Sequence, residues 1–339
     1  MIRFENDYTR GTHPAILERL VKTNDEQTPG YGTDVYCERA ADLIKKACNK
    51  PDADVHFLVG GTQTNLTVIT SLLRPHEGVI APTTGHIAVA ETGAIEATGH
   101  KVITLPTTDG KITANQIKAV LDVPDNVHAP RPGMIFLSQS TELGGIYSLE
   151  ELRAIKTVAT AFNVPLFIDG ARLGYALAAP TNDVSLEDIA SICDIFYIGG
   201  TKVGALFGEA VVIVNETLKK DFRYIMKQRG GLMAKGRLLG VQFETFFEDG
   251  LYVDIARHGV DMAMKLKQAI QEANIEFLYP AVTNQLFVKL TTAQYEKLSQ
   301  TYSFTPWGPW ENGMAVRICT DWSTKPGDVE KLIADIKGL

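Results

Sequence analysis

The sequence predicts an α/β protein, with a large domain built on a mostly parallel, helix-covered sheet and a smaller C-terminal α+β domain. Short apolar runs alternate with helical patterns over about 160 residues, which is the order that builds a parallel sheet. These runs are continuously apolar, as expected of strands that are buried on both faces. The alternation ends after Val214. We therefore expect an N-terminal arm at 1–20, a large domain at 21–245 and a small domain at 246–339.

Composition excludes several classes of protein. The 339 residues are 45% hydrophobic and 22% charged, and the net charge of −7 argues against a nucleic-acid or anionic-membrane partner. The four cysteines are scattered without a C-x-x-C pair, which indicates reduced thiols and no metal site. No apolar run is long enough to span a bilayer, and the N-terminus lacks the apolar core of a signal peptide. We therefore expect a cytoplasmic protein without a membrane partner.

The first part of the chain alternates helices and strands. Pro14 inside the first turn and Thr12 as a cap predict a helix at 14–21, and Thr113 caps another predicted helix. Apolar spacing predicts the other helices, and Pro and Gly mark loops at 28–33 and 124–132. The predicted helices are 14–21, 34–49, 66–73, 89–97, 113–121 and 149–163, and the predicted strands are 55–59, 78–81, 101–105, 133–138, 164–168 and 195–198.

The remaining part predicts a change of architecture. An apolar run at 209–214 is expected to add an antiparallel strand to the large sheet. A helix at 218–228 and a glycine-broken turn at 229–236 follow. A long helical stretch at 238–273, interrupted near Asp249 and Gly250, leads to strands at 285–290 and 314–319 and a closing helix at 325–337.

Two strand ends carry the residues with the clearest chemistry. The run 164–168 stops at Asp169, and the run 195–198 leads into Gly199-Gly-Thr-Lys202. Ligand-binding groups in open α/β sheets collect beyond the carboxyl ends of the strands. A lysine that forms a Schiff base and an aspartate that pairs with a ring nitrogen are the two groups that pyridoxal 5′-phosphate (PLP) requires. The alternatives are a surface lysine and an aspartate that caps a helix or pairs with Arg172.

Other residues are weaker candidates. Gly60-Gly-Thr-Gln-Thr-Asn65 follows a strand and opens a helix, so it could cradle an anion, although it fits neither G-x-G-x-x-G nor the Walker pattern. His86 follows another strand and could face a cofactor ring and move a proton, or be an ordinary loop histidine. Arg172 and Arg317 could bind a carboxylate through two hydrogen bonds, although Arg317 could also lie on a solvated face of its strand.

The chain resembles the low-specificity threonine aldolase branch of the β-eliminating lyase superfamily, PLP enzymes of the aspartate aminotransferase fold. The resemblance covers essentially the whole chain. Ile168-Asp-Gly-Ala-Arg172 and Thr201-Lys202 are its most specific part. The segments that support it are Tyr31-Gly32, Gly61-Thr62, His86, the loop Asn126-Val-His-Ala-Pro-Arg131, and Val316-Arg-Ile-Cys-Thr320.

The resemblance implies a role for each matching position. Lys202 is similar to the Schiff-base lysine, Asp169 to the partner of the pyridine nitrogen, and His86 to the ring-stacking histidine. His128 is similar to a second active-site histidine. Groups on the cofactor are expected at Gly61, Thr62, His86, Asp169, Thr201, Lys202 and Lys235, and groups on the substrate at Asn6, Tyr31, Arg172 and Arg317.

Several positions depart from the family pattern. Thr201 stands where serine is usual, Lys235 where an arginine usually reaches the neighbouring subunit's phosphate, and Asn6 where a serine is usual. The strand ending Leu137-Ser-Gln-Ser-Thr-Glu142 differs most. The resemblance also implies a homodimer or homotetramer with its active site at the subunit interface, to which Tyr31 and Lys235 are expected to contribute.

The resemblance implies aldol cleavage of β-hydroxy-α-amino acids, converting L-threonine or L-allo-threonine to glycine and acetaldehyde. His86, His128 or a water could be the base. PLP-dependent β-elimination, which releases ammonia and a keto acid, is the alternative that uses the same lysine. A nucleotide-dependent oxidoreductase and a non-catalytic binding protein are the other classes, against which the absent G-x-G-x-x-G and the presence of Lys202, Asp169 and Arg317 argue.

Overall fold

The computed structural model describes all 339 residues and confirms the predicted fold class. Seven strands form one sheet in the order β2-β8-β7-β6-β5-β3-β4. The bounds of these strands are β2 (Asp54–Leu58), β3 (Glu77–Pro82), β4 (Val102–Leu105), β5 (Arg131–Ser138), β6 (Leu166–Asp169), β7 (Ile195–Gly199) and β8 (Glu209–Ile213). Strands β7, β6, β5, β3 and β4 are parallel neighbours, while β8 is antiparallel to both β2 and β7.

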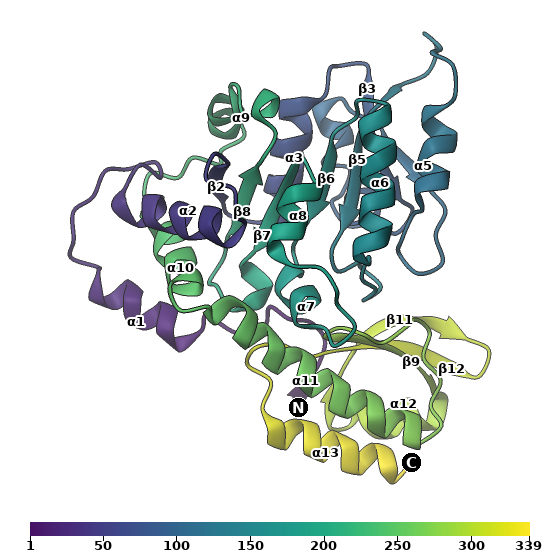
Figure 1. Cartoon of the computed structure of the whole chain (residues 1–339). Coiled ribbons are helices and arrows are strands. Elements are labelled where there is room, and N and C mark those ends of the chain that lie inside the picture. Colours follow the sequence, from purple (N-terminus) through teal and green to yellow (C-terminus); the bar gives the residue numbers. More distant parts are fainter.

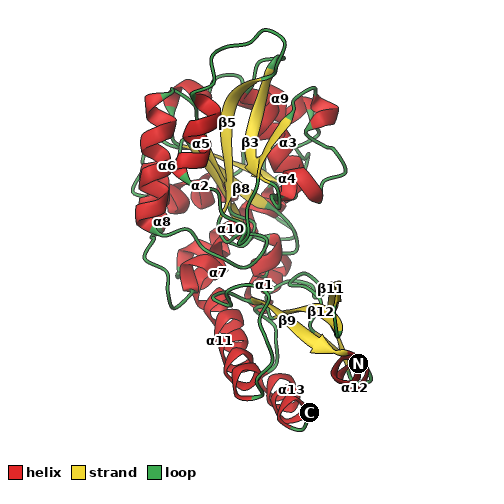
Figure 2. Cartoon of the chain, turned by 90° about the vertical axis from the view of Figure 1, so that its right-hand side faces the viewer, coloured by secondary structure: helices red, strands yellow, loops and turns green.

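Helices cover both faces of this sheet (Figures 1 and 2). In Figure 2, α5, α6 and α8 lie on one side of the strands and α3, α4 and α9 on the other. The bounds of the helices in this part of the chain are α1 (Pro14–Lys22), α2 (Val35–Ala47), α3 (Gly61–Leu72), α4 (His86–Val89), α5 (Ala114–Leu121), α6 (Leu149–Ala161), α7 (Leu173–Ala178), α8 (Leu186–Ile192), α9 (Phe222–Gln228) and α10 (Arg237–Glu248). Strands β6 to β8 and the part of β5 from Met134 onward are therefore buried, in agreement with their continuous apolar runs.

A second, smaller unit carries a three-stranded antiparallel sheet in the order β11-β12-β9, at the bottom of Figure 1. Its own apolar core contains residues of the long helix α11 and of the closing helix. The N-terminal strand β1 pairs with β10 of this unit, so the two ends of the sequence meet here. The elements are β1 (Ile2–Arg3), α11 (Leu251–Glu272), β9 (Gln285–Thr291), α12 (Thr292–Ser299), β10 (Tyr302–Ser303), β11 (Thr305–Trp310), β12 (Gly313–Cys319) and α13 (Pro326–Lys337).

Three predicted helices have different bounds. The helix predicted at 89–97 does not form: α4 ends at Val89, and only a 3-10 helix at Glu96–Thr98 follows. Thr92 and Gly93 have positive φ angles of 54° and 70° that no α-helix accommodates. The helix predicted at 66–73 begins at Gly61, and the one predicted from 218 begins only after Asp221, whose φ is 61°. The predicted break near Gly250 is confirmed, with a φ of 72°.

The first helix is capped by a different residue from the one predicted. The Nδ1 atom of His13 accepts a hydrogen bond of 3.3 Å from the Ala15 N–H. The Thr12 hydroxyl instead donates to the carbonyl of Gly204 at 2.8 Å. Thr12 therefore links the N-terminal segment to the turn at 201–204, which contains Lys202. Thr113 forms the capping box that its sequence predicted.

Candidate active site

A cavity of about 170 Å³ lies where β5, β6 and β7 end and α3 begins. It collects most of the predicted site residues from segments far apart in the sequence. Parallel strands place their carboxyl ends at one edge of a sheet, and this explains the convergence. Among the residues that line the cavity are Gly61, Thr62, His86, Asp169, Arg172, Thr201 and Lys202.

Asp169 is buried and fully hydrogen-bonded at the end of β6. Its Oδ1 atom accepts from the Ala171 N–H at 2.9 Å, and its Oδ2 atom accepts from the Asn65 side-chain amide at 3.1 Å. Only glycine fits at the next position, because a Cβ on Gly170 would lie 1.8 Å from the Tyr197 carbonyl oxygen. Asp169 is therefore a carboxylate held in one position, and it lines the cavity.

His86 belongs to a hydrogen-bonded chain that reaches Asp169. Its Nδ1 atom lies 2.8 Å from the Oε1 atom of Glu91, which also accepts from the Asn65 amide at 2.7 Å. The hydrogen bond to Glu91 raises the pKa of His86 above its ordinary value, although burial opposes the change. The order His86–Glu91–Asn65–Asp169 fixes the imidazole at the cavity wall. Glu91 was not among the predicted residues, and Asn65 was considered only as the end of a possible anion cradle.

Lys202 follows β7 in the short helical turn Thr201–Val203. Gly204 ends the turn with a φ of 109°, a conformation that only glycine adopts at low cost. The backbone carbonyl of Lys202 accepts a hydrogen bond of 2.7 Å from the Tyr175 hydroxyl. Burial, followed by the nearby charge of Arg172, lowers the pKa of the Lys202 amine. A lowered pKa increases the neutral fraction, which is the nucleophilic form of an amine.

Thr201 lines the cavity, but its hydroxyl already has a partner. It donates to Glu209 Oε1 at 2.9 Å and accepts from the Gly208 N–H at 3.0 Å. The second carboxyl oxygen of Glu209 accepts from the Gly200 N–H at 3.1 Å. Burial raises the pKa of Glu209 above its ordinary value. Glu209 was not among the predicted residues, since only its tertiary position brings it to the cavity.

The two arginines are held by the N-terminal segment. Arg172 donates from Nε to Asp7 Oδ2 at 2.7 Å and from Nη2 to Asp7 Oδ1 at 3.0 Å. Arg317, on β12, donates from Nη2 to the Glu5 carbonyl at 2.9 Å and does not line the cavity. Asn6 lies between these two anchors, and its Oδ1 atom accepts from the Tyr8 N–H at 3.0 Å. The segment 5–7 therefore links both arginines, although only Arg172 lines the cavity.

The structure places His128 outside the cavity, contrary to the prediction. It is exposed on the loop that precedes β5, whereas the cavity lies where β5 ends at Ser138. Strand β5 has eight residues, so these two ends are roughly 25 Å apart. The amino end of a parallel strand cannot contribute to a site at the carboxyl end.

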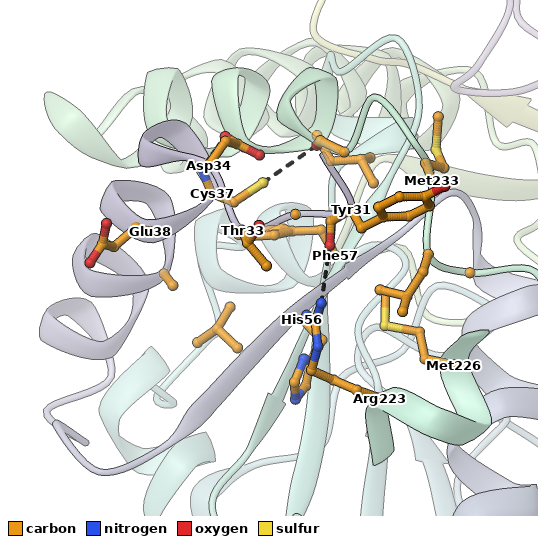
Figure 3. Close-up of a pocket in the computed structure, with 17 residues that line it drawn as sticks. Tyr31, Thr33, Asp34, Cys37, Glu38, His56, Phe57, Arg223, Met226 and Met233 are labelled. Atoms are coloured by element: carbon orange, nitrogen blue, oxygen red, sulfur yellow. Dashed lines mark hydrogen bonds between the residues drawn. The ribbon is translucent and has the colours of Figure 1, made fainter. Parts of the chain in front are cut away.

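Tyr31 and Lys235 also lie outside this cavity. Tyr31 lines a separate hollow of about 340 Å³ between α2 and α9, shown in Figure 3. Its carbonyl accepts from Arg223 Nη2 at 3.1 Å, and the Lys227 amine lies 4.5 Å from the centre of its ring. Lys235 is exposed on the neighbouring turn. Within one chain, neither residue lines the cavity that contains Lys202.

The cavity also contains a carboxyl group that the sequence reading did not select. Glu142 follows β5 and lines the same cavity as Lys202, together with Ser138 and Ser140. Its Oε1 atom accepts from the Ser138 hydroxyl at 2.7 Å and from the His86 N–H at 2.9 Å. Glu142 lies in the turn that follows Ser138, the last residue of β5, so it is an acid near the carboxyl end of a buried strand, as Asp169 is on β6.

The residues of the cavity fit PLP. The N-terminus of α3 has no side-chain cap, so its free N–H groups at Gly61 and Thr62 are available to a phosphate. The hydroxyls of Tyr197 and Ser140 line the cavity and are buried without a hydrogen-bond partner. An anion cradle, an amine of lowered pKa and a fixed carboxylate are the groups such a cofactor needs.

Sheet and site together define an α/β enzyme of the aspartate aminotransferase type. Residues 6–293 match the β-eliminating lyase family. A low-specificity L-threonine aldolase of a Pseudomonas species is 30% identical, with 99% of this chain and 97% of that protein covered. The solved threonine aldolase of Leishmania major is 42% identical, with a TM-score of 0.98 over 100% of this chain and 99% of that one.

The chain therefore belongs to the β-eliminating lyase family, in its threonine aldolase branch. The solved aspartate aminotransferase of Thermus thermophilus shares the fold, with a TM-score of 0.72 at 12% sequence identity. The match covers 100% of this chain and 91% of that one. The chain is accordingly a lyase that acts on a small amino-acid substrate, and its family consists of PLP enzymes. No helix combines the length and the apolar composition needed to cross a membrane.

Proposed function

We propose that the chain binds PLP in the cavity at the carboxyl end of β7, with Lys202 as the covalent attachment residue. Gly61 and Thr62 at the start of α3 bind the phosphate, and Asp169 pairs with the ring nitrogen. When bound, PLP supplies an electron sink for a bond to the α-carbon of an amino acid. Asn65 holds Asp169 in place at 3.1 Å, and Glu91 holds His86 at 2.8 Å against the ring face.

The reaction is the aldol cleavage of β-hydroxy-α-amino acids, with L-threonine or L-allo-threonine giving glycine and acetaldehyde. The observation that carries this proposal is the convergence of Lys202, Asp169 and His86 in one cavity of a chain with threonine aldolase relatives. Arg172, fixed by Asp7, lies on the same wall and binds the substrate carboxylate. Asn6, which lies in the N-terminal segment, and Arg317, which donates to the Glu5 carbonyl of that segment, complete the carboxylate site.

Product analysis tests the reaction. PLP-loaded protein is mixed with carbon-13-labelled L-allo-threonine and followed by NMR, and equal amounts of glycine and acetaldehyde are expected. Ammonia and 2-oxobutyrate would instead assign β-elimination. Reduction with borohydride before digestion tests the cofactor site, because the reduced adduct should be found by mass spectrometry on the peptide that contains Lys202. An adduct on Lys235 would refute the assignment.

We further propose a homodimer or homotetramer in which Tyr31 and Lys235 of one subunit complete the site of its neighbour. Their exposure and their separation from the Lys202 cavity support this arrangement. Subunit complementation tests it: Lys202→Ala and Lys235→Ala protomers are each defective alone and should regain activity when mixed. Mixtures no more active than the average of the two, or an active monomer by ultracentrifugation, would contradict it.

We also propose that the protein is cytoplasmic. Its four cysteines are unpaired and buried, which is consistent with the reducing conditions of the cytoplasm.

A further inference from the structure

Three carboxyl groups line the Lys202 cavity, and they differ in how their oxygen atoms are used. Asp169 accepts hydrogen bonds on both oxygens, from Ala171 and Asn65. Glu209 also accepts on both, from Thr201 and Gly200. In Glu142 only Oε1 accepts hydrogen bonds, while Oε2 is buried without any partner. Glu142 is therefore the cavity carboxyl with a free oxygen.

The backbone that carries Glu142 is held firmly. Gln139 exchanges two hydrogen bonds with the backbone of Tyr147, of 3.1 Å and 2.9 Å. The Thr141 N–H donates to the Gly145 carbonyl at 2.8 Å, which closes the turn around Glu142. The Ser138 hydroxyl and the His86 N–H then fix the Oε1 atom. Because Oε1 is fixed on a rigid turn, the direction of Oε2 is fixed as well.

We propose that Glu142 is the base that accepts the proton of the substrate's β-hydroxyl group, and that Ser138 and the His86 backbone position it. This inference rests on the proposed aldol cleavage and assigns its base. The expected second histidine, His128, lies at the far end of β5, and the Nδ1 atom of His86 is already paired with Glu91. The sequence left His86, His128 or a water as the base, and Glu142 is a fourth candidate.

The proton and electron balance of this step is complete. The hydroxyl proton passes to Oε2 of Glu142, and the C–O single bond becomes the C=O bond of the aldehyde. The bond between the α- and β-carbons breaks, and its electron pair remains with the α-carbon fragment. Glu142 then gives up the proton that it accepted, and one proton is added to the α-carbon, so that glycine forms and Glu142 is again a carboxylate after one turnover.

The surroundings of Glu142 suit a proton acceptor at neutral pH. Burial raises the pKa of its carboxyl group above the ordinary value, and the Ser138 hydroxyl partly opposes this. Asp169 on β6 raises the pKa of Glu142 further, and the Lys202 and Arg172 cations line the same cavity. Tyr147 is another titratable group near it, and His86 lines the same cavity. A carboxylate with a raised pKa is a stronger base than an exposed glutamate.

Glu142→Gln tests the proposal, because glutamine keeps an oxygen for Ser138 and His86 and places an amide where Oε2 was. Cleavage of L-allo-threonine should slow by roughly 10²- to 10⁴-fold, the contribution of a general base. Exchange of the glycine α-proton in deuterated water should be retained, because it needs Lys202 and Asp169 but no β-hydroxyl. Cleavage that falls less than about threefold, or both reactions falling equally, would overturn the proposal.

Ser138→Ala provides a second test that does not depend on the folding of the glutamine variant. Loss of its hydroxyl removes a donor to the carboxylate and should move the acid limb of kcat/KM to higher pH. Ser71→Ala on α3 is the matched control, since the Ser71 hydroxyl bonds only to the Val68 carbonyl at 2.8 Å. An unchanged acid limb in Ser138→Ala would contradict the role of Glu142.

Infrared titration of the cofactor-free protein separates this proposal from the proposed function. A protonated-carboxyl band that is present in the wild type and absent in Glu142→Gln should titrate above the ordinary glutamate range. Wild-type protein without aldolase activity would refute the proposed function, whatever the infrared result. Active wild-type protein without this band would refute the assignment of Glu142 alone.

Discussion

Asp7 binds Arg172 through both carboxylate oxygens, with Nε to Oδ2 at 2.7 Å and Nη2 to Oδ1 at 3.0 Å. Both side chains are buried, and Asn284 also donates to Asp7 at 3.0 Å. The pair joins the N-terminal segment to the turn after β6. Arg172 is thus held by this contact and can offer only its remaining N–H groups to a substrate.

Asp7→Asn should destabilise the protein, because it leaves the buried guanidinium without its counter-charge. We expect the free energy of unfolding in urea to fall by roughly 3–5 kcal/mol. Asp122→Asn is the control, because it breaks the exposed pair with Lys118 and should cost less than about 1 kcal/mol. Equal effects of the two substitutions would contradict the assigned role of the Asp7 pair.

The Asp7–Arg172 pair should also affect how the free energy of unfolding changes with pH in acid. Burial alone would raise the pKa of Asp7, but the charge and hydrogen bonds of Arg172 outweigh it and hold the pKa below the ordinary 3.8. The stabilisation is therefore present above pH 3.8 and is lost as the pH falls through the lower folded-state pKa. Urea titrations between pH 2 and 6 should show a smaller slope in Asp7→Asn, and identical slopes would refute this.

Glu91→Gln should lower the pKa of His86, because the Glu91 hydrogen bond is the largest cause of its rise. The His86 ring signals can be followed by NMR titration, with His100, which bonds to the Glu77 carbonyl, as an internal reference. The pair stabilises the folded state fully below pH 6.5 and loses this effect as the pH rises through the folded-state pKa. A His86 titration unchanged by the substitution would show that Glu91 does not set it.

Gly170→Ala should disrupt the strand-end turn that presents Asp169. The added Cβ would lie 1.8 Å from the Tyr197 carbonyl oxygen, so the backbone must move, at a cost of about 1–3 kcal/mol or more. Gly327→Ala on α13 is the control, since its Cβ would meet open space and alanine favours helices. Chemical denaturation compares the two, and equal stability of both variants would contradict the close approach.

The lowered pKa of Lys202 predicts the pH dependence of cofactor uptake. Burial and Arg172 favour the neutral amine, which attacks the aldehyde of the cofactor. The rate at which the cofactor-free protein gains its visible absorption band should rise with pH and reach its midpoint below 10.5, the ordinary value for lysine. A midpoint at or above that value would show that the cavity does not activate Lys202.

The sequence predicted the strands and their terminal residues well, since buried parallel strands have a local signature. Asp169, Lys202 and the antiparallel strand β8 follow from such runs. Short elements were missed where the pattern is weak: α7 and α8 have six and seven residues, and β11 contains two prolines and a glycine. The residues that sequence reasoning could not find, Asp7, Asn65 and Glu91, act through contacts between distant segments.

His128 shows why motif position alone misleads. Its loop is adjacent in sequence to β5, but it is attached to the amino end of that strand, and the cavity lies at the carboxyl end. Glu142 lies at the correct end. The strand-end rule would have selected it, although its free oxygen becomes evident only from the hydrogen bonds of the folded chain.

Acetaldehyde release from L-allo-threonine by PLP-loaded wild-type and Lys202→Ala protein tests the central claim most directly. The wild type should release acetaldehyde and glycine in equal amounts, and the variant should lose the cofactor band and nearly all activity. Full turnover by Lys202→Ala, or release of ammonia and 2-oxobutyrate by the wild type, would contradict the assignment of this chain as a lysine-dependent aldolase.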